Sequence, residues 1–501
     1  MTERVGELRE RLAEVVDLRN AGRLLQWDQQ TMMPPRGGAS RADSLATLER
    51  LSHEMFVSAE TGRLLEAAEA DLNGTPLDSD DACLVRVVTS RWEKARRVPS
   101  ELAAELAHAG SIGQEAWVEA RSKSDFAAFR PHLERNLELA RRYVDCFDGF
   151  DCAYDALLDD YEPGMKTTEV AALFAELKAE LVPLIATIAQ RPDAVDASCL
   201  HGHFPIARQR HLVAAVVERM GFDGQAWRMD DAVHPFATSV GSADVRITTR
   251  WDETYFASGL YGAMHECGHG LYEAGIDPAL ARTPLGSADS LGLHESQSRM
   301  WENMVGRGAS FSHYLAPLVA AEFGNGLSGL EPATYYRAVN KVAPSFIRVE
   351  ADEATYGLHI VLRFELEQEL IEGRLAVSDL REAWNARFKE YLGLEVTDDA
   401  DGVLQDVHWG AGLIGYFPTY ALGNMIAGQL WEKIATDMPD RDERIAAGEL
   451  APLREWLREN VHRHGSKFRT QELLRRVVGG PIEVQSFVRY LKAKLRDVYG
   501  L

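Results

Sequence analysis

The segment from Tyr255 to Tyr272 predicts a helix that is apolar on nearly every side and still carries two histidines and a glutamate. These are His265, Glu266 and His269, and the apolar residues around them are Tyr255, Phe256, Leu260, Tyr261, Met264, Leu271 and Tyr272. A helix without a polar face is buried inside a large protein. Buried ionisable groups need partners, because an unpaired charge is costly away from water. The rest of the chain must therefore fold around this helix and bring partners to it.

The three ionisable residues have the H-E-x-x-H spacing of a metal site. His265 and His269 lie four residues apart, so both imidazoles project from one face of the helix and can bind one ion. Zinc in catalytic sites takes three protein ligands and a water. Glu266 is placed to act on that water as a general base. Cys267 points about 200° away from His265 and is expected to be a packed thiol instead of a ligand.

A third protein ligand is expected downstream, in a second buried helix that begins near Leu291. Glu295 is the predicted ligand, because a glutamate after the H-E-x-x-H segment completes the His-His-Glu set of many zinc peptidases. His294 and Glu302 are the alternatives. His294 also suits a structural role beside the ligands, and Glu302 also suits the orientation of a ligand histidine.

The remaining pattern predicts a mainly α-helical protein. Apolar residues recur at helical spacing in segments 5–16, 170–181 and 487–495. Segment 227–251 differs, because apolar and polar residues nearly alternate there between Pro and Gly interruptions. We therefore expect a small antiparallel sheet of two or three strands beside the H-E-x-x-H helix.

Charge and cysteine usage limit the partners and the compartment. The chain has 54 Lys+Arg against 77 Asp+Glu and a formal net charge of -23, which argues against nucleic acid or an anionic membrane as a partner. Five scattered cysteines do not make a disulfide framework. There is no signal-like opening segment and no apolar run of about 18 residues. The predicted location is the cytoplasm.

Six short motifs together make the sequence resemble the carboxypeptidase Taq family of metallocarboxypeptidases. An early Trp27-Asp28-Gln29 with Met33-Pro34 adds to the resemblance. The six motifs occur in order at His234–Phe236, Asp244–Thr248, His265–His269, His294–Gln297, Ile347–Asp352 and Gly402–Trp409. They span most of the chain, so the resemblance covers essentially the whole sequence.

The resemblance implies one large helical domain with a deep central groove, similar to neurolysin and angiotensin-converting enzyme. Within it, residues 1–220 would form N-terminal helices that are candidates for a movable lid, 221–430 the groove and metal site, and 431–501 the C-terminal helices. It implies a homodimer with one zinc, or cobalt, per subunit. It implies removal of residues one at a time from free peptide C-termini, with broad preference. The implied ligands are His265, His269 and Glu295, with Glu266 as the base.

A carboxypeptidase must also bind the terminal carboxylate of its substrate, and a guanidinium suits that task. Arg348 is the first candidate, and Asp352, four residues later, could hold its guanidinium in place. Arg246 is the second candidate. The other expected substrate contacts are His408, as a donor to the oxyanion or carboxylate, Tyr420, as support for the tetrahedral intermediate, and His234 and Gln405, which line the groove.

Three other functions fit parts of the pattern. An oligopeptidase would use the same metal chemistry on internal bonds. A di-metal helix-bundle oxidase would use paired E-x-x-H spacings, which also occur at Glu105 with His108 and at Glu459 with His462. A non-catalytic scaffold would carry the motif by accident, although an intact base and third ligand argue against it.

Overall fold

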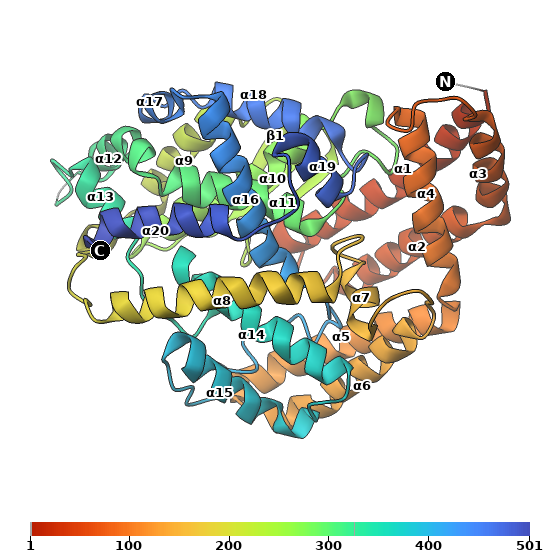
Figure 1. The fold of residues 1–501 in the computed structure, drawn as a ribbon, viewed down its shortest axis with the longest axis horizontal. Helices are drawn as coiled ribbons and strands as arrows, with labels where there is room; N and C mark the ends of the chain where they lie inside the picture. Colours follow the sequence, from red (N-terminus) through yellow and green to blue (C-terminus); the bar gives the residue numbers. More distant parts are fainter. Residues whose placement is uncertain (1–2, 325) are drawn as a thin grey trace.

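Helices form most of the computed structural model, which describes residues 3–324 and 326–501 (Figure 1). The helices predicted at 5–16 and 170–181 are confirmed as parts of α1 and α8, and the one at 487–495 is part of α20. The first half of the chain forms α1 (Glu3–Thr31), α2 (Gly38–Val57), α3 (Ala59–Asp71), α4 (Asp80–Arg97), α5 (Ser100–Lys123), α6 (Phe126–Val144), α7 (Ala153–Leu158), α8 (Thr167–Ala189) and α9 (Ile206–Met220).

The second half contains the sheet and the helices that bear the predicted ligands. Its elements are β1 (Trp227–Asp231), β2 (Ala237–Gly241), β3 (Asp244–Thr249), α10 (Phe256–Gly275), α11 (Leu291–Arg299), a π-helical segment (Met300–Gly306), α12 (Ala309–Phe323), α13 (Pro332–Val339), α14 (Glu353–Ile371), α15 (Leu380–Leu392), α16 (Pro418–Asp437), α17 (Arg441–Ala446), α18 (Ala451–Asn460), α19 (Thr470–Val477) and α20 (Gln485–Tyr499). Short 3-10 turns lie at Ser198–Leu200, Pro278–Leu280, Arg348–Glu350, Val377–Asp379 and His462–His464.

The sheet lies where the alternating pattern predicted it, but its strands are not all antiparallel. The order is β1-β3-β2. A hairpin makes β2 antiparallel to β3, whereas β3 runs parallel to β1, with Trp227 opposite Val245. The expectation of a fully antiparallel sheet was therefore wrong. Alternation defines which residues face the core, but the order in which strands join the sheet depends on the path of the chain between them.

The helix at the centre of the sequence argument is buried as expected. β3 packs against α10, and α11 lies between α10 and α16. Glycines allow these close approaches. A Cβ at Gly268 of α10 would lie 2.8 Å from the Cα of Ser298 in α11, and a Cβ at Gly423 of α16 would lie 2.8 Å from the Cβ of Glu295. The backbones thus meet too closely for any larger residue, which brings α11 within reach of the two histidines.

One helix, α14, buries charged side chains. α14 is buried on all sides over most of its length, and it nevertheless carries Arg363 and Glu367 at 0% and 1% exposure. Both side chains face a long loop between α15 and α16. None of the described helices contains an apolar stretch long enough to cross a membrane.

Candidate metal centre

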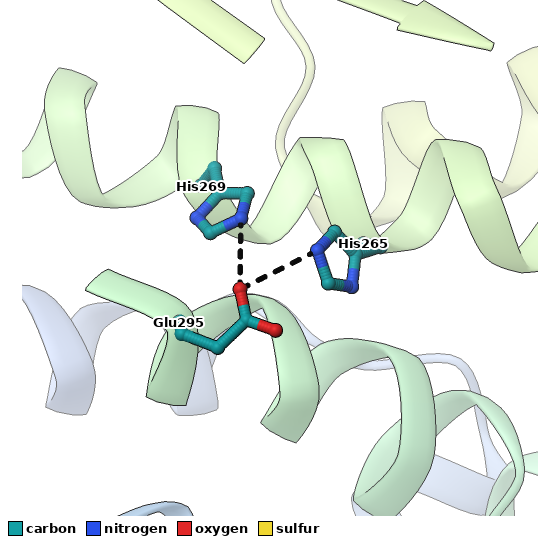
Figure 2. A group of neighbouring side chains, drawn as sticks. All are labelled: His265, His269 and Glu295. Atoms are coloured by element: carbon teal, nitrogen blue, oxygen red, sulfur yellow. Dashed lines mark ion pairs between the residues drawn. The ribbon is translucent and has the colours of Figure 1, made fainter. Parts of the chain in front are cut away.

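His265, His269 and Glu295 come together from two helices. Figure 2 shows both imidazoles on α10 facing the Glu295 carboxylate on α11. The Oε2 atom of Glu295 lies 3.7 Å from Nε2 of His265 and 3.4 Å from Nε2 of His269. Donors about 2.1 Å from one tetrahedral ion lie about 3.4 Å from each other. Both nitrogen-to-oxygen distances therefore fit a zinc-sized ion among the three donors, all of which lie within 4.8 Å of one another.

Hydrogen bonds on the outer side orient His265. Its Nδ1 donates to the Glu302 carboxylate at 2.8 Å, which leaves Nε2 directed at Glu295. Arg307 in turn donates to Glu302 at 2.6 Å. Glu302 lies in the π-helical segment that continues α11, and such segments often mark functional sites. Glu302 therefore lies behind His265 and outside the group of three donors, which agrees with a role in orienting that histidine.

The protonation states of Glu295 and His269 suit a metal ion. Burial would raise the pKa of Glu295, but Arg299 and the two imidazoles outweigh burial and hold this pKa well below its usual range. Arg299 donates to Glu295 at 2.6 Å. Burial lowers the pKa of His269 to about 3, so its imidazole is neutral at pH 7. A neutral imidazole beside an ionised carboxylate is the state that binds a metal.

Glu266 lies beside the three donors without belonging to their group. It is 6% exposed, and burial raises its pKa to about 7. A carboxylate with a pKa near neutrality can both take up and release a proton. The buried Cys267, on the same helix, is free of any disulfide, and burial raises the pKa of its thiol, which agrees with the expected packed thiol.

Arg348 lies in a second buried polar cluster. Its Nε and Nη2 atoms donate to one oxygen of Asp406 at 3.0 and 2.8 Å, and Nη1 donates to the hydroxyl of Tyr356 at 2.9 Å. The other Asp406 oxygen accepts from Arg363 at 2.7 Å. One carboxylate thus pairs with two guanidiniums, and Arg348 is only 5% exposed.

The expectation that Asp352 holds Arg348 was wrong. Asp352 instead caps α14, and its Oδ1 accepts from the backbone N–H of Ala354 at 2.9 Å and of Thr355 at 3.1 Å. The spacing of four residues suggested an ion pair on one helix, but Arg348 lies in a short 3-10 turn before α14 begins. Asp406, far along the chain, takes the role instead.

The structure joins this second cluster to the three donors through an aromatic ring. The guanidinium of Arg299, which binds Glu295, stacks 4.0 Å from the ring centre of Tyr356. The hydroxyl of the same tyrosine accepts from Arg348. A continuous path of contacts therefore runs from the predicted ligand to the predicted carboxylate-binding residue.

Three other predicted residues gather around Arg348. The side-chain oxygen of Gln405 accepts from the backbone N–H of Arg348 at 2.9 Å. His408 Nε2 and the Tyr420 hydroxyl lie 3.2 Å apart, and Arg348 stacks 4.8 Å from the ring centre of Tyr420. Burial lowers the pKa of His408 to about 4, so this imidazole is neutral at pH 7.

Comparison with known proteins agrees with this arrangement. Residues 7–495 match the family described as carboxypeptidase Taq (M32) metallopeptidase. The chain belongs to this family. It is 42% identical over 97% of both chains to thermostable carboxypeptidase 1 of Thermus thermophilus and 36% identical over 95% of both to carboxypeptidase 1 of Bacillus subtilis. The crystal structure of the M32 carboxypeptidase from Deinococcus radiodurans superposes with a TM-score of 0.95, at 38% identity and over 100% of both chains.

The last two predicted substrate-binding residues of this metallocarboxypeptidase, Arg246 and His234, do not belong to the cluster around Arg348. Arg246 on β3 pairs with Asp244 at 2.8 Å and stacks 4.3 Å from the ring centre of Trp27 on α1. His234 is exposed in the connection between β1 and β2. Within the described part of the chain, neither residue forms a hydrogen bond or ion pair with the three donors or with the cluster around Arg348, so their substrate contacts stay predictions.

A di-metal oxidase would need further metal ligands, and residues 3–324 and 326–501 contain no second cluster of them. The His-His-Glu group is the only cluster of three or more possible ligands there. Glu105 pairs with Arg135 and Arg142 at 2.6 and 2.8 Å. Glu459 pairs with Arg463. The family membership and the single cluster both favour the metallopeptidase.

Sequence reasoning missed three contacts that hold the site together. Arg299 follows Glu295 by one helical turn, so the i, i+4 spacing could have identified that pair. The ion pair of Arg363 with Asp406 and the bond from Trp409 Nε1 to the Glu367 carboxylate at 2.8 Å join segments far apart in the chain. No local sequence pattern marks such pairs.

Proposed function

We propose that this chain is a metal-dependent carboxypeptidase that removes residues one at a time from peptide C-termini with broad preference. His265, His269 and Glu295 would hold one ion per subunit, zinc or cobalt, and the spacing of their donor atoms at 3.4 and 3.7 Å is the observation that carries the proposal. Two imidazoles and one carboxylate are a common ligand set of catalytic zinc.

The residues around the ion would divide the chemistry between them. The bound ion would supply Lewis acidity to the scissile carbonyl and to a water. Glu266 takes a proton from the attacking water and passes it to the leaving amine, a transfer that its raised pKa supports. Glu302 keeps the outer nitrogen of His265 protonated, so the inner nitrogen is free to bind.

Arg348 is the proposed site for the terminal carboxylate of the peptide. A guanidinium has five N–H donors, and Arg348 uses three of them on Asp406 and Tyr356. Two N–H groups remain for a substrate. Asp406 fixes the guanidinium in place, and His408 and Tyr420 stand beside it as further donors to the carboxylate or the oxyanion. Gln405, Arg246 and His234 are the other proposed contacts along a central groove.

The helices of residues 1–220 are a proposed lid over that groove, with the metal site in 221–430 and the supporting helices in 431–501. Hydrogen bonds tie α5 and α6 to the loop that bears His408. Trp117 donates to the carbonyl of Leu404 at 2.8 Å, and Asn136 donates to the carbonyl of Trp409 at 2.8 Å. Movement of these helices would therefore act on the loop.

A homodimer in the cytoplasm is proposed on the family resemblance and on the cysteines, all five of which are free. Sedimentation equilibrium of the purified protein tests the assembly. A mass of twice 55.7 kDa is expected, and a mass of one chain at micromolar concentration would contradict the proposed dimer.

The reaction is tested with one peptide made in two forms, with a free and with an amidated C-terminus. We expect a ladder of products shortened from the C-terminus for the free peptide only, because the amide cannot pair with Arg348 as a carboxylate does. A chelator should stop the ladder, and added zinc should restore it. Equal cleavage of both peptides at internal bonds would instead indicate an oligopeptidase.

A further inference from the structure

The two histidines of the metal centre are anchored in different ways. His265 is oriented by the hydrogen bond from its Nδ1 to Glu302. The Nδ1 of His269 is buried and has no hydrogen-bond partner among the described residues. Metal-binding histidines are usually fixed by a hydrogen bond on the nitrogen that does not bind the metal. Something else must set the ring plane of His269.

A ring stacked on His269 fills that role. The imidazole of His294, on α11, lies 4.4 Å from the imidazole of His269, centre to centre, with 16° between the planes. The same imidazole also stacks with the ring of Tyr272 of α10, at 5.4 Å between centres and 26° between planes. His294 thus stacks with two rings from the helix that carries both histidines of the centre.

The stack continues to the C-terminal part of the chain. Tyr272 lies 5.0 Å from the ring of His462, with 29° between the planes. His462 is fully buried, and its Nε2 donates to the Oε1 of Gln297 on α11 at 2.9 Å. Gly275 leaves room for this ring, because a Cβ there would lie 2.7 Å from it. Four rings therefore form one column that is tied to α11 at its far end.

We propose that His294 is a positioning residue that sets the ring plane of His269 by stacking, with Tyr272 and His462 as its backing. The Nε2 of His294 donates to Glu273 at 3.0 Å, which keeps its own ring from turning. This inference rests on the proposed metal site. It assigns His294, one of the alternatives for the third ligand, to a place behind the ligands.

Two substitutions test the ring of His294 and its hydrogen bond to Glu273 separately. His294→Phe keeps a flat ring against His269 and loses the bond to Glu273, whereas His294→Gln keeps a donor for Glu273 and loses the ring. We expect His294→Gln to weaken zinc binding by about 10- to 100-fold, the usual loss when the support of a ligand is removed. His294→Phe should keep most of the affinity. Competition between the apoprotein and a chromophoric chelator measures the zinc dissociation constant.

Two further measurements make the result specific. The visible spectrum of the cobalt-loaded protein should change in His294→Gln, because the geometry at the ion changes, and should be retained in His294→Phe. Thermal unfolding of each apoprotein shows whether the variant is folded. His313→Ala, which removes an exposed histidine on α12, is the matched control and should bind zinc like the wild type.

The inference is overturned if folded His294→Gln binds zinc as tightly as the wild type, or if His294→Phe loses as much affinity as His294→Gln. If His294→Phe does not fold, Tyr272→Leu removes the next ring of the column and should also weaken binding, while unchanged affinity would count against the column. His265→Ala tests the metal site itself. Equal zinc binding by this variant and the wild type would refute the proposed site, whatever the His294 variants do.

Discussion

Replacing Glu266 with Gln is expected to lower kcat by about 10²- to 10⁴-fold, the usual contribution of a general base, while the protein keeps its fold and its metal. The amide has nearly the same shape as the carboxylate, but it cannot take a proton from water. Glu266 is not one of the three clustered donors, so the ion should remain. Hydrolysis of a peptide with a free C-terminus, together with elemental analysis of the purified variant, measures both quantities.

Glu119→Gln is the matched control for this prediction. Glu119 lies on α5 with its side chain 70% exposed and pairs with Lys123, so the same chemical change there should leave kcat unaltered. An unchanged kcat in Glu266→Gln would refute the proposed mechanism. Loss of the metal in that variant would show that Glu266 acts as a ligand instead of a base.

The second large effect is expected on stability. Asp406→Asn should lower the free energy of unfolding by about 3–5 kcal/mol, the usual cost of removing one partner from a buried ion pair. Arg348 and Arg363 are 5% and 0% exposed, and both pair with Asp406. The neutral amide would leave two positive charges without a counter-charge in the interior. Urea unfolding at pH 7 measures the difference.

Asp442→Asn is the control, because Asp442 pairs with Arg441 but has a side chain that is 62% exposed. A change within about 0.5 kcal/mol is expected there. If Asp406→Asn were as stable as this control, the cluster around Arg348 would not be a strong ion-pair network. The proposed role of Asp406 in positioning Arg348 would then be refuted.

The difference in unfolding free energy between the wild type and Asp406→Asn should depend on pH. Burial would raise the pKa of Asp406, but Arg348 and Arg363 outweigh burial and hold this pKa well below its usual range. An aspartate in the unfolded chain titrates near about 3.9. The stability contributed by Asp406 is therefore complete above about pH 4 and lost as the pH falls further toward its folded pKa. The gap between wild type and Asp406→Asn should be constant from pH 5 to 8 and narrow only below about pH 4.

Local spacing predicted those parts of the site that lie on single helices. The turn between His265 and His269 placed both imidazoles on one face, and the apolar surroundings placed that face in the interior. The position of Glu295 after the first helix predicts it as the third ligand, and the structure brings its carboxylate to within 3.7 Å of both histidines. Spacing did not predict the partner of Arg348, since Arg348 lies in a 3-10 turn that precedes the helix capped by Asp352.

The sequence by itself determined the helices, the position of the small sheet, the two histidines with Glu266, and the family. These follow from periodicity and from motifs that occupy neighbouring positions in the chain. Only the tertiary structure decided that β1 runs parallel to β3, that Asp406 pairs with two arginines, and that His462 ends a column of rings leading to His269. Each of these contacts joins segments that meet only after the chain has folded, and no residue pattern within one segment specifies its distant partner.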